Sequence, residues 1–374
     1  MSDRPIRALF VVPHLAAGGA ERHVSTLLPR MDPARFTPSV VCIGWDGELF
    51  ADLSATGVAT RALWLRKRQA PRALRELISI MKRERPDVVV VTGRNAEILG
   101  RVAARLAGVA HTIMWVHHTS EILPRGIVHR TVDRVLNRWT SAYFGVAEAQ
   151  RRFLVHERGY PDDKVRIIHN GVDAALFDVT TRRDVLAEIG FAEGDPVVGI
   201  LGALRKEKDH ATFLRAARVV LDEMPRARFL VIGDGPCRPQ LEALCAELRI
   251  TPNVHFAGMR RDVDRMLCAV DVFAMTSTTE CFPMALLEAM ACARPVVCTA
   301  VGGIIEIVND GETGYLVPPK DPAQIAARLL RLLSDPQTAR GMGLAGRQRV
   351  EAEFGLDRSV EGAQRAIEGM VAAR

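Results

Sequence analysis

Several features that would have directed the interpretation are missing from this chain of 374 residues. Its apolar stretches fall short of the roughly 20 residues that a membrane-spanning helix needs, and its N-terminus carries charge without the apolar segment of a secretion signal. Its seven cysteines are an odd number and include no Cys-x-x-Cys pair, which argues against a disulfide framework or a zinc site and favours a reducing compartment. We therefore expect a cytoplasmic protein.

Two ligand-binding motifs are also absent. After an expected first strand at residues 6–12, the chain reads Pro13-His14-Leu15-Ala16-Ala17-Gly18-Gly19, which is not the G-x-G-x-x-G fingerprint of dinucleotide-binding proteins. Gly18 and Gly19 can still bring the backbone close to a phosphate or a sugar, or they can form an ordinary turn from strand to helix. No Asp-x-Asp pair follows a strand near the candidate residues named below, so no metal site is expected.

What the chain does have is the composition of a globular protein, with 48% apolar and 25% charged residues. At this length two domains are the default. Buried-strand patterns alternate with helical patterns on both sides of a turn at residues 169–173, which is typical of doubly wound α/β folds. The expected strands are residues 6–12, 39–43, 62–65, 87–92, 112–116, 142–146 and 165–168 in the first half, and 196–201, 228–232, 253–256, 270–275, 295–299 and 314–317 in the second.

The charge is unevenly distributed between the two halves. Residues 1–175 hold 26 Lys and Arg against 17 Asp and Glu, a net charge of +9, whereas the remainder carries −3. Basic residues gather at 66–83, at 151–152, and on an expected helix as a stripe of Arg130, Arg134 and Arg138. These groups are either solvated helix faces or a surface for anionic lipid headgroups or a phosphate-bearing acceptor. Nucleic acid is a poorer fit, because the stretches lack the interleaved aromatic residues of a stacking platform.

The Arg stripe lies opposite an expected apolar face of Val128, Val132, Val135, Leu136 and Trp139.

The strongest candidate for a binding site is the stretch of residues 274–298. Glu280 falls in a polar loop after a strand, and Glu288 falls in the second turn of a helix in which Pro283 suits the first position. The free N–H groups at the start of such a helix can bind an anion such as a diphosphate. Two carboxylates beside that anion site suggest a nucleotide-sugar, although two solvated acids are the plain alternative.

Other strand ends of the second half add charge and glycine. Arg205 and Lys208 follow its first strand, where they are well placed to neutralise a diphosphate. Gly233 and Met259 stand at the ends of the next two strands. In the first half, His117 at a strand end could hydrogen-bond a sugar hydroxyl, or it could be a structural histidine.

These residues resemble the retaining glycosyltransferases of family 4, also called glycosyl transferases group 1. The most specific part is Glu280-Cys281-Phe282-Pro283-Met284-Ala285-Leu286-Leu287-Glu288, which is similar to the E-x7-E signature of that family. Gly18-Gly19-Ala20-Glu21, Asn170-Gly171-Val172-Asp173, Gly233-Asp234-Gly235-Pro236 and Gly302-Gly303 support it. The chain departs from the family at Ala203, where many members have arginine, and at Ala147, where they have serine. We expect Arg205 to replace the missing arginine.

The resemblance implies the GT-B architecture, in which two Rossmann-like doubly wound α/β domains face a cleft. It also implies that the last helix crosses back onto the first domain. The expected domains are therefore an N-terminal acceptor-side domain of residues 1–172 plus 355–374 and a C-terminal donor-binding domain of residues 173–354.

The resemblance also implies a role for each candidate residue. Lys208 and Arg205 stabilise the departing diphosphate, Glu280 and His117 lie near the transferred sugar, and Glu288 accepts hydrogen bonds from the ribose. The nucleotide, its phosphates and the sugar are further contacted by Gly18, Gly19, Phe282, Met284, Ala285, Met259 and Gly233.

The implied reaction moves a sugar from a nucleoside-diphosphate-sugar to an acceptor hydroxyl with retention at the anomeric carbon. We expect the acceptor to be a glycan or lipid-linked molecule of cell-surface polysaccharide or glycolipid biosynthesis, used at the inner face of the membrane. The alternatives are a nucleotide-sugar epimerase or a glycogen-type synthase on the same fold, and a catalytically silent nucleotide-sugar-binding protein.

The family works without a bound metal or other cofactor, so we expect sugar transfer to persist in EDTA. The measurement is the rate of product formation before and after chelation. A loss of transfer that Mn²⁺ restores would contradict this expectation.

Overall fold

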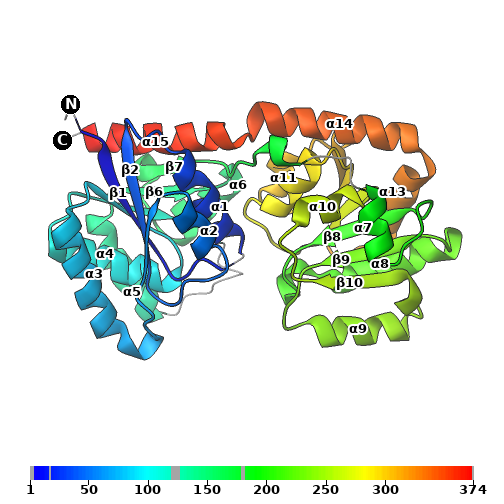
Figure 1. Cartoon of the computed structure of the whole chain (residues 1–374), viewed down its shortest axis with the longest axis horizontal. Coiled ribbons are helices and arrows are strands. Elements are labelled where there is room, and N and C mark those ends of the chain that lie inside the picture. Colours follow the sequence, from blue (N-terminus) through cyan, green and yellow to red (C-terminus); the bar gives the residue numbers. More distant parts are fainter. Residues whose placement is uncertain (1–3, 17, 119–126, 178–181, 373–374) are drawn as a thin grey trace. The chain divides into compact units, whose positions relative to one another are not determined.

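The computed structural model describes residues 4–16, 18–118, 127–177 and 182–372 (Figure 1). Its contacts divide the chain into two compact units. Unit 1 consists of Met1–Gly171 with Leu356–Arg374, and unit 2 of Val172–Gly355. Each unit is built on a parallel β-sheet with helices on its faces, and each is described by itself below.

Unit 1 contains a seven-stranded sheet in the order β3-β2-β1-β4-β5-β6-β7. The first strand therefore lies inside the sheet, and the chain builds outward from it in both directions. β4 is a run of four buried valines, as expected for a strand covered on both faces. The strands are β1 (Ile6–Val12), β2 (Phe36–Cys42), β3 (Ala59–Ala62), β4 (Val88–Val91), β5 (His111–Trp115), β6 (Ala142–Gly145) and β7 (Val165–Ile167). The helices are α1 (Gly19–Leu27), α2 (Phe50–Ala55), α3 (Ala70–Glu84), α4 (Arg94–Ala107), α5 (Ile127–Leu136), α6 (Glu148–Arg152) and α15 (Leu356–Ala372).

The last helix, α15, packs into unit 1. Ala363 and Ile367 on its inner face are fully buried. Arg35, which precedes β2, forms ion pairs of 2.7 Å with both Glu361 and Glu368 of this helix. Apolar burial together with these charged contacts holds the C-terminal segment against residues from the start of the chain.

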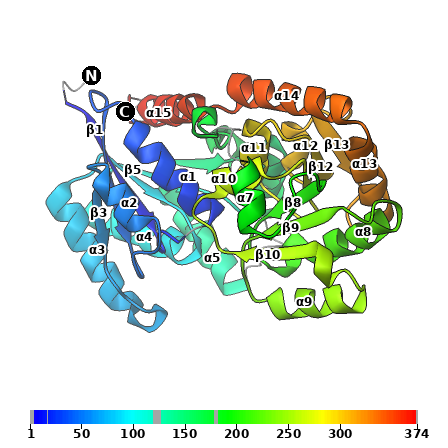
Figure 2. The ribbon, with the colours of Figure 1, turned by 45° about the vertical axis from the view of Figure 1, so that its right-hand side comes forward.

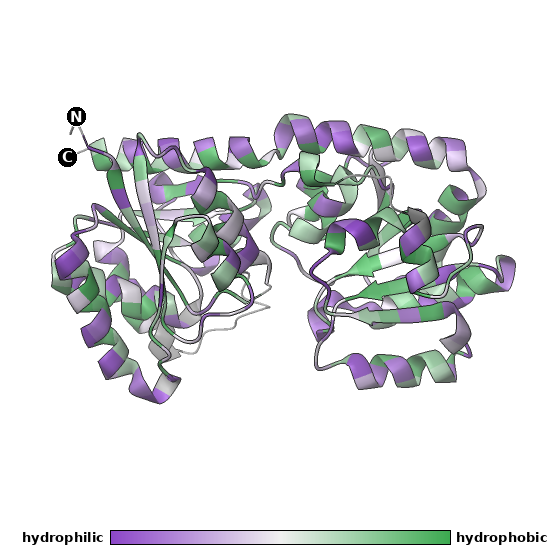
Figure 3. Ribbon diagram, in the orientation of Figure 1, coloured by the Kyte–Doolittle hydropathy of each residue, from purple (hydrophilic) through white to green (hydrophobic). Residues whose placement is uncertain are grey.

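Unit 2 contains a six-stranded parallel sheet in the order β10-β9-β8-β11-β12-β13. In Figure 2 the helices α8 and α13 lie side by side, and in Figure 3 the strands are largely hydrophobic while the helices alternate in hydropathy. The strands are β8 (Val197–Leu201), β9 (Arg228–Ile232), β10 (Val254–Gly258), β11 (Val272–Met275), β12 (Val296–Thr299) and β13 (Gly314–Val317). The helices are α7 (Arg182–Glu188), α8 (His210–Glu223), α9 (Arg238–Glu247), α10 (Val263–Cys268), α11 (Met284–Ala291), α12 (Ile304–Ile307), α13 (Pro322–Ser334) and α14 (Pro336–Glu353).

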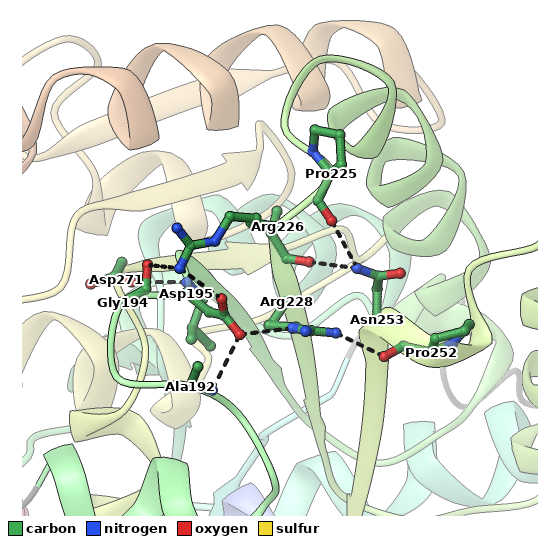
Figure 4. A network of polar contacts seen from close by, with 11 residues as sticks. Ala192, Gly194, Asp195, Pro225, Arg226, Arg228, Pro252, Asn253 and Asp271 are labelled. Carbon is green, nitrogen blue, oxygen red and sulfur yellow. Dashed lines mark hydrogen bonds and ion pairs between the residues drawn. The ribbon is translucent and has the colours of Figure 1, made fainter.

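A polar network ties together the amino ends of the strands in unit 2 (Figure 4). The buried carboxylate of Asp195, just before β8, accepts a 2.9 Å hydrogen bond from Arg228 Nε at the start of β9. Arg228 Nη1 donates to the carbonyl of Pro252 at 2.9 Å, and the Asn253 amide donates to the carbonyl of Ala227 at 3.1 Å. These bonds link the amino ends of β8, β9 and β10, which are neighbours in the sheet.

The prediction of two Rossmann-like doubly wound sheets is confirmed, and one strand position in unit 1 is corrected. The strand expected at residues 62–65 is β3, which ends at Ala62. Trp64 has a φ of +57°, a left-handed conformation that a strand does not contain. An apolar run therefore continues past the end of the strand.

The apolar face expected for the Arg stripe helix is confirmed at Leu136, which is buried, and is wrong at three other residues. Val132, Val135 and Trp139 of α5 and the turn after it are 36%, 44% and 44% exposed. Among the described side chains of α5, the polar residue that is buried is Asp133, which pairs with the buried Arg101 and accepts a 2.9 Å hydrogen bond from Tyr160. An internal ion pair thus decides which face of the helix is buried, in preference to the apolar pattern. The side chains of Val128 and Arg130 lie outside the described part of the chain.

Candidate active site

The strand order of unit 2 creates a switch point between β8 and β11. These strands are neighbours, yet the chain continues from β8 to β9 on one side and from β11 to β12 on the other. In doubly wound sheets, ligands bind at the carboxyl ends of the strands at such a point. The loops that follow β8 and β11 carry Lys208 and Glu280, respectively.

Lys208 and Glu280 meet across this switch point. Lys208 Nζ lies 2.5 Å from Glu280 Oε1, and Ser277 Oγ donates a 2.7 Å hydrogen bond to the same oxygen. The Glu280 side chain is only 7% exposed, whereas that of Lys208 is 27% exposed. The carboxylate is therefore held inside the protein, and the ammonium group also faces solvent, where it can contact an incoming anion.

Backbone and hydroxyl contacts position the two loops. Thr276 Oγ1 donates to the carbonyl of Asp209 at 2.9 Å, and Thr278 N donates to the carbonyl of Glu207 at 2.8 Å. Thr299 Oγ1 at the end of β12 donates to the carbonyl of Ser277 at 2.6 Å. Residues 276–279 were expected to form a polar loop, and no role was predicted for any of them. The signal in the sequence was the run of three threonines and one serine, because the hydroxyl groups of these residues often form hydrogen bonds with the backbone.

Two glycines in the site are required by their surroundings. A Cβ on Gly302 would lie 1.8 Å from the Glu280 carbonyl oxygen, and Gly302 has a φ of +51°. A Cβ on Gly233, which has a φ of +133°, would lie 2.1 Å from the Gly202 carbonyl oxygen. The chain segments after β8, β9, β11 and β12 therefore approach each other more closely than any side chain allows. From the sequence alone, Gly302 was indicated only by the family resemblance.

Helix α11 begins close to the predicted place. It spans Met284–Ala291, and Pro283 is its N-cap residue with extended ψ, so the expectation that Pro283 occupies the first helical position is wrong by one residue. Glu288, in the second turn, is 4% exposed, and Phe282 and Met284 are also buried. Both signature glutamates are thus buried acids, and the reading of them as solvated acids is wrong.

Two other candidates of unit 2 are more exposed. Arg205 follows β8 and has an exposed side chain, and no described residue accepts a hydrogen bond from its guanidinium. Met259 follows β10 and is 64% exposed. The sheet order puts β9 between β10 and β8, so Met259 lies two strands away from the loop that carries Lys208.

The remaining candidates lie in unit 1. Gly18 is the N-cap residue of α1 with a φ of −95°, and no atom lies within 4 Å of a Cβ built on Gly19. Neither position has the left-handed conformation that favours glycine. At Gly19 there is also no close neighbour that would exclude a side chain. His117 stacks on Trp115 with ring centroids 5.7 Å apart, and its buried Nε2 has no hydrogen-bond partner among the described residues. Burial lowers the pKa of His117 well below its usual value, so the imidazole is neutral at neutral pH.

The described residues of the two units include no cluster suited to a metal ion. Within the ranges that the structure describes, no three His, Cys, Asp or Glu side chains lie close enough together to bind one. None of the described helices is both long enough and apolar enough to cross a membrane.

Comparison with known proteins identifies the family. A family model described as "Glycosyltransferase Family 4" matches residues 17–176, and one described as "Glycosyl transferases group 1" matches residues 195–335. The alpha-maltose-1-phosphate synthase of Mycolicibacterium smegmatis is 30% identical over 285 residues, which cover 69% of this chain and 72% of the relative. The chain is a family 4 glycosyltransferase. The resemblance stated from the sequence is thereby confirmed. The alternatives, which are an epimerase or glycogen-type synthase and a silent binding protein, are not favoured.

Other similarities of this glycosyltransferase extend over much of the chain. The UDP-Gal:alpha-D-GlcNAc-diphosphoundecaprenol alpha-1,3-galactosyltransferase of Escherichia coli is 25% identical over 273 residues, covering 71% of this chain and 70% of the relative. Other curated relatives match over about half of their own length. The crystal structure of Anabaena HepE in complex with UDP-glucose has a TM-score of 0.86 at 21% identity and covers 98% of this chain and 100% of that one. The last likeness shows the GT-B fold.

The contact between Gly302 and the Glu280 backbone gives a prediction for this glycosyltransferase. Gly302→Ala must displace the Glu280 carbonyl and with it the carboxylate that Lys208 contacts, so we expect at least a tenfold loss of transfer rate. Gly311→Ala is the matched control, because Gly311 has a φ of +80° but no atom within 4 Å of its Cβ, so that only the backbone strain is introduced. The measurement is the transfer rate of both folded variants. Equal effects in the two would show that the contact with Glu280 is unimportant.

Proposed function

We propose that this glycosyltransferase moves a sugar from a nucleoside-diphosphate-sugar to an acceptor hydroxyl with retention at the anomeric carbon and without a bound metal. The observation that carries the proposal is the Lys208–Glu280 pair at the switch point of unit 2. This pair supports the proposal because a partly exposed cation, Lys208, lies beside a buried acid, Glu280. Both lie at the edge of the sheet where doubly wound folds bind nucleotides.

Lys208 is proposed to stabilise the leaving diphosphate. As the bond from the anomeric carbon to the diphosphate breaks, negative charge develops on the departing oxygen, and a positioned ammonium group lowers the energy of that state. Arg205, on the same loop, has a guanidinium with no acceptor among the described residues and is proposed to bind the other phosphate oxygens. The acceptor then attacks from the face that the diphosphate leaves, and the diphosphate takes up the hydroxyl proton.

The two signature glutamates are proposed to orient the donor. Glu280 accepts hydrogen bonds from Lys208 and Ser277 through Oε1, which fixes its carboxylate for contacts with sugar hydroxyls. Glu288 is proposed to accept from the ribose, and the backbone of Phe282, Met284 and Ala285 at the start of α11 to bind sugar and phosphate. A neutral His117 is suited to a hydrogen bond with an uncharged sugar hydroxyl. Gly18, Gly19, Gly233 and Met259 are proposed to contact the nucleotide and its phosphates.

The acceptor is proposed to be a glycan or a lipid-linked molecule. The net charge of +9 in residues 1–175 suits a phosphate-bearing acceptor. The Escherichia coli relative, whose name specifies a diphosphoundecaprenol acceptor, supports the same class.

Lys208→Ala tests the proposal. A thermal-shift screen of the wild type against nucleoside-diphosphate-sugars first identifies the donor, because specific binding raises the melting temperature. With that donor we expect the variant to lose roughly 10²–10³-fold in transfer rate, since one charged group that stabilises the leaving oxygen is missing. Nuclear magnetic resonance of the wild-type product is expected to show the anomeric configuration of the donor.

The control for this test is Lys206→Ala, which removes an exposed lysine from the same turn, Lys206–Lys208. It is expected to leave the transfer rate within about twofold of the wild type. Similar losses in both variants, an inverted anomeric centre, or no thermal shift with any nucleotide-sugar would contradict the proposal.

Attachment to an anionic membrane surface is proposed for unit 1. The exposed Val132, Val135 and Trp139 lie on one helix and its following turn, beside the exposed Arg134 and Arg138. Apolar side chains next to arginines are typical of helices that lie in the headgroup region of a membrane.

Vesicle binding tests this attachment. We expect the protein to sediment with vesicles that contain anionic lipid and to be released as salt is raised, because the attraction between charges is screened. Trp139→Ala should reduce the bound fraction severalfold. Binding that is absent at low salt, or unchanged in the variant, would remove the membrane from the proposal.

A further inference from the structure

Unit 1 contains a hollow that none of the roles above uses. Its volume is about 640 Å³, within the roughly 300–1,000 Å³ of pockets that bind small molecules. It lies over the carboxyl ends of β1 and β2, the segment after β3, and the starts of α3 and α4, and so spans four strands that are neighbours in the sheet. This is the edge of a doubly wound sheet where ligands bind.

The lining of the hollow is mostly apolar. Its polar side chains are His14, Asn95 and Arg66. A bound sugar ring would need more convergent hydrogen-bonding groups than these, whereas a hydrocarbon needs none. Apolar side chains from five separate segments make up the wall, among them Pro13, Ile43, Leu65, Ala73, Ile98 and Leu99.

Two tryptophans line the same hollow. The chain has only four tryptophans, and Trp45 and Trp64 are 42% and 63% exposed. Trp64 also has a φ of +57°, an arrangement that costs free energy for a bulky residue and that proteins retain where the surrounding structure requires it. An exposed aromatic pair at the mouth of an apolar hollow is a surface that gains free energy by being covered.

The walls are fixed by backbone hydrogen bonds. Trp64 N donates to the Gly44 carbonyl at 2.8 Å, and Gly44 N donates to the Pro13 carbonyl at 2.8 Å. The segments after β1, β2 and β3 are therefore bonded in series, so the hollow is formed before any ligand arrives. A preformed site loses less conformational entropy on binding.

Positive charge lies at the edge of the hollow. Arg66 lines it, and Arg68, Arg72 and Arg75 follow on the same segment and α3. All four side chains are exposed, and none forms an ion pair with a described residue. An apolar hollow that is lined by one unpaired arginine, Arg66, is complementary to a molecule that joins a hydrocarbon to a phosphate.

We propose that this hollow binds the hydrocarbon next to the phosphate of an isoprenoid-phosphate acceptor, with Trp45 and Trp64 against the chain and Arg66 against the phosphate. The inference rests on the proposed function, because it names the acceptor class and its place on unit 1. It adds a site of apolar recognition on unit 1 that is built from residues other than the proposed donor-binding residues.

The test is isothermal titration calorimetry of the full-length protein with citronellyl phosphate, a ten-carbon isoprenoid phosphate, below its aggregation concentration. We expect saturable binding that inorganic phosphate does not reproduce. Trp64→Ala removes an exposed wall and is expected to weaken binding about tenfold or more. Ala70→Trp fills the hollow from the start of α3 and should have a similar effect, and Arg66→Gln should remove the preference for citronellyl phosphate over citronellol.

The matched control is Leu106→Ala, because Leu106 is an apolar residue of α4 that is 57% exposed and does not line the hollow. It should bind citronellyl phosphate as the wild type does. Circular dichroism confirms that each variant is folded. The inference is overturned by an absence of binding, by equal binding of inorganic phosphate, by unchanged binding in Trp64→Ala and Ala70→Trp, or by binding of a methyl glycoside in place of the lipid.

The same preparations separate this inference from the proposed function. A thermal shift with nucleotide-sugars reports on donor binding, in which no residue that lines the hollow has a proposed role. If citronellyl phosphate binds and no nucleotide-sugar does, the lipid-binding role of the hollow is supported and the proposed transfer reaction is contradicted. If a nucleotide-sugar binds and its sugar is transferred while citronellyl phosphate does not bind, the proposed transfer reaction is supported and the inference about the hollow is contradicted. Binding to anionic vesicles without binding of the monomeric lipid also overturns it.

Discussion

The contact between Lys208 and Glu280 is the constraint on which the rest of the site depends. The two residues are 72 positions apart and meet because β8 and β11 are neighbours in the sheet. A buried carboxylate is costly unless it is paired and hydrogen-bonded, and here Lys208 and Ser277 supply both. That requirement explains the threonines that bond the loop backbones and the absence of a side chain at Gly302. The ammonium group is in turn held where it remains partly exposed to solvent.

Much of the site could be predicted because its residues follow local rules. Parallel strands read as apolar runs, and their ends are marked by glycine and charge, so Lys208, Glu280 and Gly233 stood out along the chain. The spacing of Glu280 and Glu288 around a helix start needed no knowledge of the rest of the fold. The pairing of Lys208 with Glu280 could not be derived in this way, because it depends on which strands become neighbours.

The wrong predictions for residues 62–65 and for α5 have a common physical cause, which is that long-range contacts override local sequence patterns. The run at residues 62–65 is apolar because Trp64 and Leu65 line a hollow, and it is not part of a strand. In α5 the valines suggested a buried face, but the pairing of Asp133 with Arg101 determines which side is buried. In both places apolar residues lie on the surface, where a ligand or a membrane can cover them. Local periodicity cannot distinguish a side chain that faces the core from one that faces a ligand.

The position of α15 has a consequence for how the chain folds during synthesis. Unit 2 is continuous from Val172 to Gly355, so all of its strands and helices are synthesised before the segment that forms α15. Unit 1 begins at the N-terminus, but Arg35 has no Glu361 or Glu368 to pair with until the final helix is complete. The first sheet must therefore remain without its last covering helix while the second is translated. Although domains usually fold in the order of their synthesis, here the second can be completed first.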